Sequence, residues 1–542
     1  MSETTFGRLV FEPRLTDDSR TTPARTPENE AAQSPSLMLL VLLASAGIVI
    51  YAVFLLNPGN RGDWLPFLLV IGAEAILVGQ ALLSMWTILS SGHNPRGFAF
   101  HHAQDGLYDV ADIMRQRIDD TPQRWRMYLR DRPVTVDVFI TTYGEDLDTI
   151  RRTVTAAVAM QGEHLTWVLD DGRSDAVREL TAELGARYVR RLTSNGAKAG
   201  NVNHALSLTR GELFVILDAD FVPLPTFLHE TVPFFASDDV AFVQTPQTYG
   251  NLHNLISRGA GYMQSVFYRF IQPGRNRFNA AFCVGTNVIF RRAAIDQIGG
   301  MYSDSKSEDV WTSIHLHEQG WRSIYIPTTL AIGDTPETIE AYTKQQLRWA
   351  TGGFEILFTH NPLSRKRRLT LDQRLQYLVT ATHYLGGITP LAWILFYAGF
   401  YGMQILVAFY TLGSFRWEVL MLATVSFPIY WRALVNAAFH REQKVKATSP
   451  FSFIMPQVLF FAFLLLTSVV GAWKDLSHGS LSLALIWNIT NTVILGAFVL
   501  TAAREGRRTK RAAAVGRRAV VRPRRSTAPR QPAFAGAPGG AA

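Results

Sequence analysis

The sequence contains a single cysteine, Cys283, among its 542 residues. One thiol cannot form an intramolecular disulfide, and it cannot supply a cysteine-based zinc site. A chain without disulfides fits a catalytic domain in a reducing compartment.

Charge is also scarce, because charged residues make up 18% of the chain and hydrophobic residues 48%. The usual charged share is about a quarter. The net charge of +9 is concentrated at the C-terminus, where eleven Arg or Lys and only one acid, Glu505, follow from Arg504 onward. This segment is rich in Ala, Pro and Gly, so we expect disorder and contact with anionic membrane lipids. The distribution argues against nucleic acid as a partner.

The apolar residues gather in long runs, beginning with residues 37–56 and 64–90. About twenty such residues cross a bilayer as a helix. A signal peptide is excluded because the preceding segment is long, carries charges of both signs and has no short basic region before the apolar run. Four more runs follow a polar stretch, at residues 375–412, 416–438, 452–473 and 480–502. The first of these is too long for one helix, so we expect an interfacial helix and then a span from Pro390, giving six spans in total.

Basic residues predict the orientation of these spans. Arginines occur before the first run, and Arg441, Lys444 and Lys446 follow the fourth. We therefore expect a multi-pass protein of the plasma or inner membrane, with both ends and the catalytic domain in the cytoplasm. The expected segments are 1–36 (disordered), 37–90 (two spans), 91–370 (cytosolic domain with interfacial helices), 371–502 (interfacial helix and about four spans) and 503–542 (disordered basic tail).

Within residues 91–370, short apolar runs alternate with helical patterns. Strands are indicated at 134–142, 165–169 and 213–217, and helices around 145–160, 173–184 and 198–208. This alternation predicts an α/β domain with a mostly parallel sheet and helices on both faces. Three strands end in polar or acidic residues, and ligands bind beyond the carboxyl ends of such strands.

Asp218 and Asp220 follow the third of these strands. Hard divalent cations prefer oxygen ligands and bridge to substrate phosphates, so the pair predicts Mg²⁺ or Mn²⁺ beside a nucleotide-sugar. Lys198 opens the third helix, where it is either a phosphate ligand or a solvated surface residue.

Glu308 and Asp309 begin a helical pattern. Acids at this place are either helix caps or a general base that deprotonates an acceptor hydroxyl. Gln345, Arg348 and Trp349 share one face of an amphipathic helix. Arg can grip a diphosphate and Trp can stack on a sugar, although an interfacial helix with a snorkelling Arg has the same pattern.

Together these motifs resemble the processive family-two glycosyltransferases with a GT-A fold, the family of the bacterial cellulose synthase catalytic subunit. The resemblance covers residues 130–502. Its matching segments are TTYGED (141–146), LDDG (169–172), KAGNVNHAL (198–206), DADFVPLPTFL (218–228), VQTPQ (243–247), FCVGTN (282–287), SED (307–309) and QQLRW (345–349).

The resemblance implies a role for each motif. The donor nucleotide-sugar would be held by Thr142, Tyr143, Glu145, Asp171, Lys198, Asp218, Gln345 and Arg348. Asp220 would be the stronger metal ligand, with Asp218 beside it, and Asp309 would be the catalytic base, next to Glu308. The acceptor would contact Trp349, Cys283, Gly285 and Thr286, although the thiol is shifted by one position from the family pattern.

The implied activity is inverting polymerisation of a sugar from a UDP-sugar, with export of the polymer through the spans. UDP-glucose and a β-glucan such as cellulose are the expected donor and product, and accessory export proteins are candidate partners. The alternatives are another β-linked polysaccharide or transfer of one sugar to a lipid carrier. A transporter or channel would explain the spans but not the acidic sheet edge. No regulatory β-barrel follows the last run, so we expect no activation by cyclic di-GMP.

Overall fold

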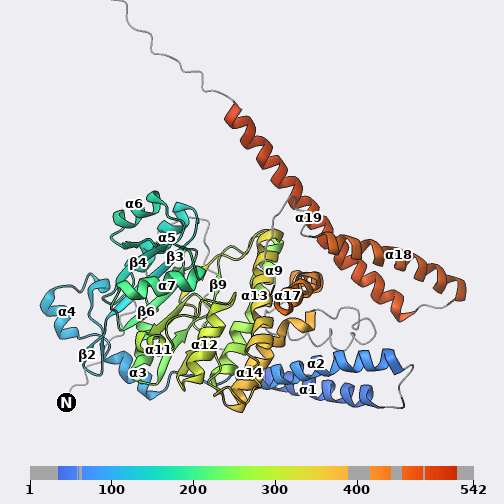
Figure 1. Ribbon diagram of the computed structural model, residues 1–542, viewed down its shortest axis with the longest axis horizontal. Helices are drawn as coiled ribbons and strands as arrows, with labels where there is room; N and C mark the ends of the chain where they lie inside the picture. The colour runs from blue at the N-terminus through green and yellow to red at the C-terminus, as the bar shows by residue number, and fades with distance from the viewer. Residues whose placement is uncertain are drawn as a thin grey trace, which may run out of the picture.

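The computed structural model describes residues 34–57, 59, 64–387, 416–440, 454–479 and 482–521. A sheet domain occupies one side of the molecule, and the apolar helices α1, α2, α18 and α19 extend from the other side (Figure 1). Helices α9 (Leu255–Val266), α13 (Ile339–Thr359), α14 (Leu371–Thr382) and α17 (Phe427–Ala438) lie between them.

The central sheet has seven strands in the order β11-β8-β10-β6-β3-β4-β5. Strand β10 is antiparallel to both of its neighbours, and the other pairings are parallel, so the expectation of a mostly parallel sheet is confirmed. The strands are β3 (Val136–Thr142), β4 (Leu165–Asp170), β5 (Arg187–Val189), β6 (Leu213–Asp218), β8 (Val240–Gln244), β10 (Val288–Arg291) and β11 (Arg322–Tyr325).

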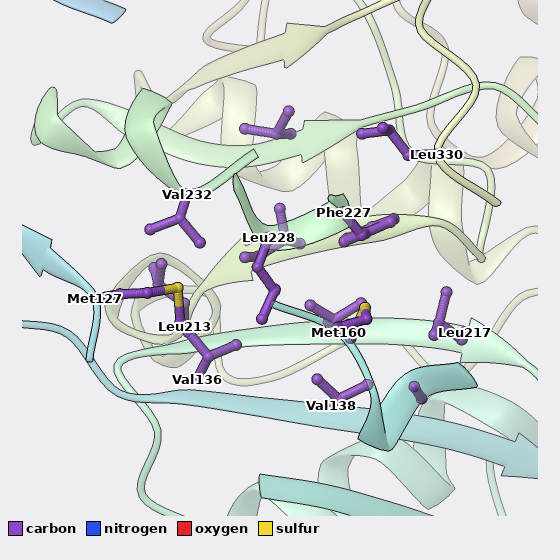
Figure 2. Close-up of a cluster of buried hydrophobic side chains, with 14 of the residues drawn as sticks. Met127, Val136, Val138, Met160, Leu213, Leu217, Phe227, Leu228, Val232 and Leu330 are labelled. Atoms are coloured by element: carbon purple, nitrogen blue, oxygen red, sulfur yellow. The ribbon is translucent and has the colours of Figure 1, made fainter. Parts of the chain in front are cut away.

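Helices cover both faces of this sheet, as the sequence pattern predicted. Because successive side chains of a strand point to opposite faces, β3 places Val138 in one buried cluster and Phe139 in another. The first cluster is shown in Figure 2 and includes residues of α5 (Leu147–Val158), α6 (Asp175–Glu183) and α8 (Phe227–Thr231). The second is covered by α7 (Ala197–Leu208), α11 (Arg292–Gln297) and α12 (Glu308–Glu318).

Smaller elements surround the sheet. A three-stranded sheet has the order β7 (Val222–Pro223), β12 (Ala331–Gly333) and β9 (Thr248–Tyr249), and it lies next to the carboxyl end of β6. The remaining elements are α3 (Phe98–Asp105), α4 (Val110–Gln116), α10 (Gln272–Asn276), β1 (Tyr128–Leu129), β2 (Arg132–Pro133), the 3₁₀ turns Pro122–Arg124, Val232–Ala236 and His383–Gly387, and the π-helical turn Phe267–Ile271.

Among the described helices, α1 (Pro35–Leu56) and α18 (Met455–His478) are long and apolar enough to cross a membrane. Helices α16 (Trp417–Val425) and α17 meet at 42° and count as a third span if the bent pair is taken as one. Helix α2 (Trp64–Leu89) has a shorter apolar stretch, at Glu74–Leu89. The number of spans, expected to be six, stays a prediction, and the one expected after Pro390 falls outside the described residues.

The C-terminal tail differs from the expectation. Helix α19 runs from Leu483 to Val521, so the prediction of disorder from residue 503 was wrong for residues 503–521. Extending an existing helix is far easier than nucleating one, and Ala, Arg and Lys are good helix formers. Residues 1–33 and 522–542, the other segments expected to be disordered, lie outside the described part of the chain.

Candidate active site

The site lies at the carboxyl ends of β3, β4 and β6. Strand β3 pairs with β4 on one side and with β6 on the other, so the strand order reverses there. A crevice at such a reversal is where open α/β sheets bind ligands. The register sets Thr141 opposite Asp218, and the Thr141 Oγ1 donates to Asp218 Oδ1 at 3.1 Å.

Lys198 lies in the first turn of α7 and reaches this edge. Its Nζ donates to a carboxylate oxygen of Asp218 and, at 2.7 Å, to the Gly285 carbonyl oxygen. The Lys198 side chain is half-buried, so the expected phosphate ligand is an ordered group within the site rather than a solvated surface lysine. The positive charge of Lys198 balances the negative charge of Asp218, one of the two predicted metal ligands.

Asp220 follows β6 at the turn into β7. Burial and, second, the negative charge of Asp218 raise the pKa of its carboxyl to about 7. Asp334, directly after β12, adds to the repulsion because the small sheet brings it close. The carboxylates of Asp218 and Asp220 offer the oxygen ligands that a hard divalent cation prefers, and a bound cation would reduce their mutual repulsion. The residues present therefore suit Mg²⁺ or Mn²⁺.

The Asp309 side chain approaches Lys198 and Gly285 from α12. A Cβ on Gly285 would lie 3.5 Å from Asp309 Oδ2 and 3.7 Å from Lys198 Nζ, so Gly285 separates the acid from the lysine. Gly285 has a φ of +86°, which other residues rarely adopt. Asp309 Oδ1 accepts from the Val310 N–H at 2.8 Å, while Oδ2 is directed towards Gly285. The residue is therefore both a helix-start acid and a member of the site.

The environment of Asp309 suits a proton acceptor. Burial and, second, the charge of Glu308 raise the pKa of its carboxyl to about 7, even though the Val310 N–H, Arg348 and Lys198 act in the opposite direction. A base is most effective when its pKa lies near the working pH.

Helix α13 carries the Gln-Gln-Leu-Arg-Trp segment, as the periodicity predicted. Gln346 is buried, and the Tyr430 hydroxyl of α17 donates to its Oε1 at 3.4 Å. Arg348 is exposed, and Gln345 and Trp349 are half-buried. Arg348 lowers the pKa of Asp309 electrostatically, which means that this face of the helix lies near the expected base.

Asp171, expected to contact the nucleoside, is held by a residue that the sequence reasoning missed. Arg191 binds both of its oxygens at 2.6 Å, and the two side chains are 8% and 7% exposed. Arg191 also donates to the carbonyl oxygens of Asn195 and Ala197, just before Lys198. The pair therefore orders the start of α7.

The neighbouring Asp170 is a structural residue. It accepts the backbone N–H groups of Arg173 and Ser174 and the hydroxyl of Tyr188, and the Thr142 hydroxyl lies 3.4 Å from it. Thr142 is thus buried behind the edge. Tyr143 is 74% exposed, and Glu145 accepts its backbone N–H at 2.6 Å, so the ring stands at the open edge of β3.

Two of the expected acceptor contacts are fully buried. The Cys283 thiol donates to the Asp309 carbonyl oxygen at 3.1 Å, and burial raises its pKa well above the ordinary value. The Thr286 hydroxyl accepts the Asp218 N–H at 2.9 Å. Neither the Cys283 nor the Thr286 side chain is therefore accessible to an acceptor. Both instead hydrogen-bond to the backbone of the carboxylate residues, Cys283 to Asp309 and Thr286 to Asp218. Gly285 between them is partly exposed.

The site thus combines a mixed α/β sheet with paired carboxylates, a lysine and a further buried carboxyl at its switch point, an arrangement that suits an enzyme acting on phosphorylated substrates. Residues 213–499 match the family model described as glycosyl transferase family group 2. The chain belongs to this family.

Its curated relatives include three bacterial proteins. A UDP-forming cellulose synthase catalytic subunit of Xanthomonas axonopodis is 35% identical over 263 residues, covering 47% of this chain and 36% of the relative. One of Pseudomonas fluorescens is 34% identical over 312 residues, 54% of this chain and 42% of the relative. Cellulose synthase 2 of Novacetimonas hansenii is 35% identical over 405 residues, 68% of this chain and 25% of the relative. The matches thus span less than half of each relative's length.

Solved structures are similar only at a distance. A mannosyltransferase from Pyrobaculum calidifontis, in complex with GDP-mannose and Mn²⁺, aligns over 68% of this chain and 100% of its own with a TM-score of 0.44 and 16% identity. A glucosyl-3-phosphoglycerate synthase from Mycobacterium tuberculosis covers 40% of this chain and 78% of its own with a TM-score of 0.30 and 17% identity. Because these TM-scores are low, the family assignment rests on the sequence match alone.

Proposed function

We propose that the chain is a processive, inverting, UDP-forming glycosyltransferase of the cell membrane. In this proposal it polymerises glucose from UDP-glucose into a β-glucan such as cellulose and passes the polymer across the membrane. The observation that carries the proposal is the convergence of Asp309, Lys198 and Asp218 around Gly285. The relatives described as UDP-forming cellulose synthases support the choice of donor and product.

The donor would occupy the edge of β3 and β6. Tyr143 would contact the nucleoside, and Lys198 would turn from Asp218 towards the diphosphate. Asp220 and Asp218 would hold Mg²⁺ or Mn²⁺, which when bound neutralises diphosphate charge and stabilises the leaving group. Arg348 would contact the diphosphate from the opposite side, since Arg binds phosphate through two parallel hydrogen bonds.

The acceptor hydroxyl would lie next to Asp309 Oδ2. In a single displacement, its oxygen forms the bond to C1 of the donor sugar, the bond from C1 to the diphosphate oxygen breaks, and Asp309 takes the hydroxyl proton. UDP leaves with the bonding electrons, and the configuration at C1 inverts. The pKa of about 7 supports this role because the carboxylate is both ionised and basic near neutral pH.

Polymer growth requires a place for the acceptor end. Trp349 lies one residue beyond Arg348 on α13, and the opposite face of this helix packs on α17. A sugar stacked on the Trp349 ring would lie against the helix that joins the expected site to the apolar helix α17. This position supports export through the membrane part rather than release into the cytoplasm.

The test of donor and product uses purified full-length protein in proteoliposomes with separately labelled nucleotide sugars. We expect incorporation from UDP-glucose into polymer that a β-glucan-specific glycosidase digests. Incorporation only from another UDP-sugar would replace the donor assignment. A product of one sugar on lipid would favour the lipid-carrier alternative.

The test of processivity is Trp349→Ala, with Trp321→Ala as the control because Trp321 is also half-buried but lies at the start of β11. Trp349→Ala should shorten or abolish the polymer while UDP binding remains measurable. The control should retain full-length product. Normal polymer length with Trp349→Ala would contradict the acceptor role of this ring.

A further inference from the structure

A cluster of two histidines and one glutamate lies outside the residues assigned to transfer. His315 and Glu318 are on α12, three residues apart and therefore on one face of the helix. His360 is the residue that ends α13. The cluster thus joins the helix that begins with Asp309 to the helix that carries Arg348 and Trp349.

The ligand atoms of this cluster have the spacing of a metal site. His360 Nε2 lies 3.1 Å from Glu318 Oε1, and His315 Nδ1 lies 3.6 Å from Glu318 Oε2. One atom from each of the three residues falls within 4.8 Å of the others. Bonds of about 2.1 Å to a tetrahedral Zn²⁺ set its ligands about 3.4 Å apart. The two distances to Glu318, one to each carboxylate oxygen, lie on either side of this value, and the separations within the three-atom set reach at most 4.8 Å.

The surroundings are those of a partly enclosed site. The Glu318 and His360 side chains are 14% and 6% exposed, and the Trp311 ring packs against the His360 ring with centroids 4.8 Å apart. His315 is 32% exposed and lines a cavity of about 420 Å³ together with Tyr302, Asp304 and Gln319. This cavity gives an ion a route of entry and leaves space for water as a fourth ligand.

Among the described residues, Arg367 places a positive group next to the cluster. Arg367 Nε lies 3.9 Å from Glu318 Oε1, which is beyond hydrogen-bond distance, and its side chain is 29% exposed. Arg367 can therefore turn towards solvent when a cation binds. Without a metal, Glu318 would instead form ion pairs with Arg367 and with a protonated histidine, which is the competing explanation of the same contacts.

We propose that His315, Glu318 and His360 bind a borderline divalent cation, with Zn²⁺ as the ion that two imidazoles and one carboxylate favour. The ion cross-links the C-terminal end of α12 to the C-terminal end of α13. It lies apart from Asp218 and Asp220, whose carboxylates suit a harder ion. The inference does not depend on the identity of the sugar or on processivity.

The experiment uses full-length protein in detergent, stripped with a chelator and then titrated with Zn²⁺ by calorimetry and with Co²⁺ by visible absorption. We expect one high-affinity ion per chain, the intense absorption of four-coordinate Co²⁺, and no displacement by excess Mg²⁺. Glu318→Gln and His315→Asn should each weaken binding by at least about 100-fold, since even the loss of a group that only orients a ligand costs 10–100-fold.

Two control variants separate this site from others. His102→Asn changes an exposed histidine of α3, and Asp220→Asn changes the expected donor-metal site, so both should keep the high-affinity ion. If Glu318→Gln aggregates, the more exposed His315→Asn decides the outcome. Failure of the wild type to bind Zn²⁺, or equal binding by His315→Asn, would overturn the proposal and leave the ion-pair explanation.

Discussion

The raised pKa of Asp309 makes the pH dependence of transfer a sensitive test of the site. The carboxyl has a pKa of about 7 instead of 3.8, a rise of about three units. Only the ionised form accepts a proton, so turnover should fall as the pH drops through 7. At pH 6 about a tenth of the enzyme would carry an ionised Asp309, as one pH unit is a tenfold change in the proton equilibrium.

Glu308→Gln perturbs this equilibrium without touching Asp309. The charge of Glu308 is the second cause of the raised pKa of Asp309, after burial. Removing that charge should lower the pKa of Asp309 and so move the acid limb of the pH profile towards lower pH. The variant should therefore be relatively more active than the wild type at pH 6.

The assay measures initial UDP release between pH 5 and 9 at saturating donor. Glu355→Gln, on α13, serves as a carboxylate-to-amide control and should leave the limb in place. An acid limb that stays at the same pH in Glu308→Gln, or that moves upwards, would refute the account of Asp309.

Three further outcomes follow from the geometry. Asp220→Asn should weaken metal-dependent UDP binding, measured by calorimetry with Mn²⁺, whereas Asp309→Asn should not. Gly285→Ala should reduce turnover and destabilise the chain by about 1–2 kcal/mol in urea unfolding, because alanine disfavours a φ of +86°. Asp171→Asn should cost about 3 kcal/mol in the same measurement, because it leaves the buried Arg191 without its carboxylate, and an unchanged midpoint would contradict the structural role of the pair.

The ends of the strands could be predicted because a short apolar run followed by acidic residues is best explained as a buried strand that ends at an exposed turn. Asp218 ends β6, one residue beyond the expected strand, and Asp309 lies in the first turn of α12 as expected. The parallel register then brings the strand ends together, which is a general property of such sheets. The sequence therefore predicted the sheet and the neighbourhood of the expected donor site.

Other features depend on tertiary contacts that no local pattern reveals. Arg191 lies in a loop twenty residues beyond Asp171, and its role follows only from their pairing. The motif containing Cys283 and Thr286 was recognised, but the burial of both side chains behind Asp309 and Asp218 depends on the packing of α12 and β6. The composition of the C-terminal tail predicts disorder, whereas in the structure α19 continues to Val521.

The most direct test of the central claim compares transfer with nucleotide binding in Asp309→Asn. The control is Asp296→Asn, which makes the same change on the exposed face of α11. Turnover of UDP-glucose should fall by about 10²–10⁴-fold in Asp309→Asn, the usual contribution of a general base, while UDP binding with Mn²⁺ stays close to that of the wild type. Near-normal turnover in Asp309→Asn would contradict the assignment of the base and the mechanism built on it.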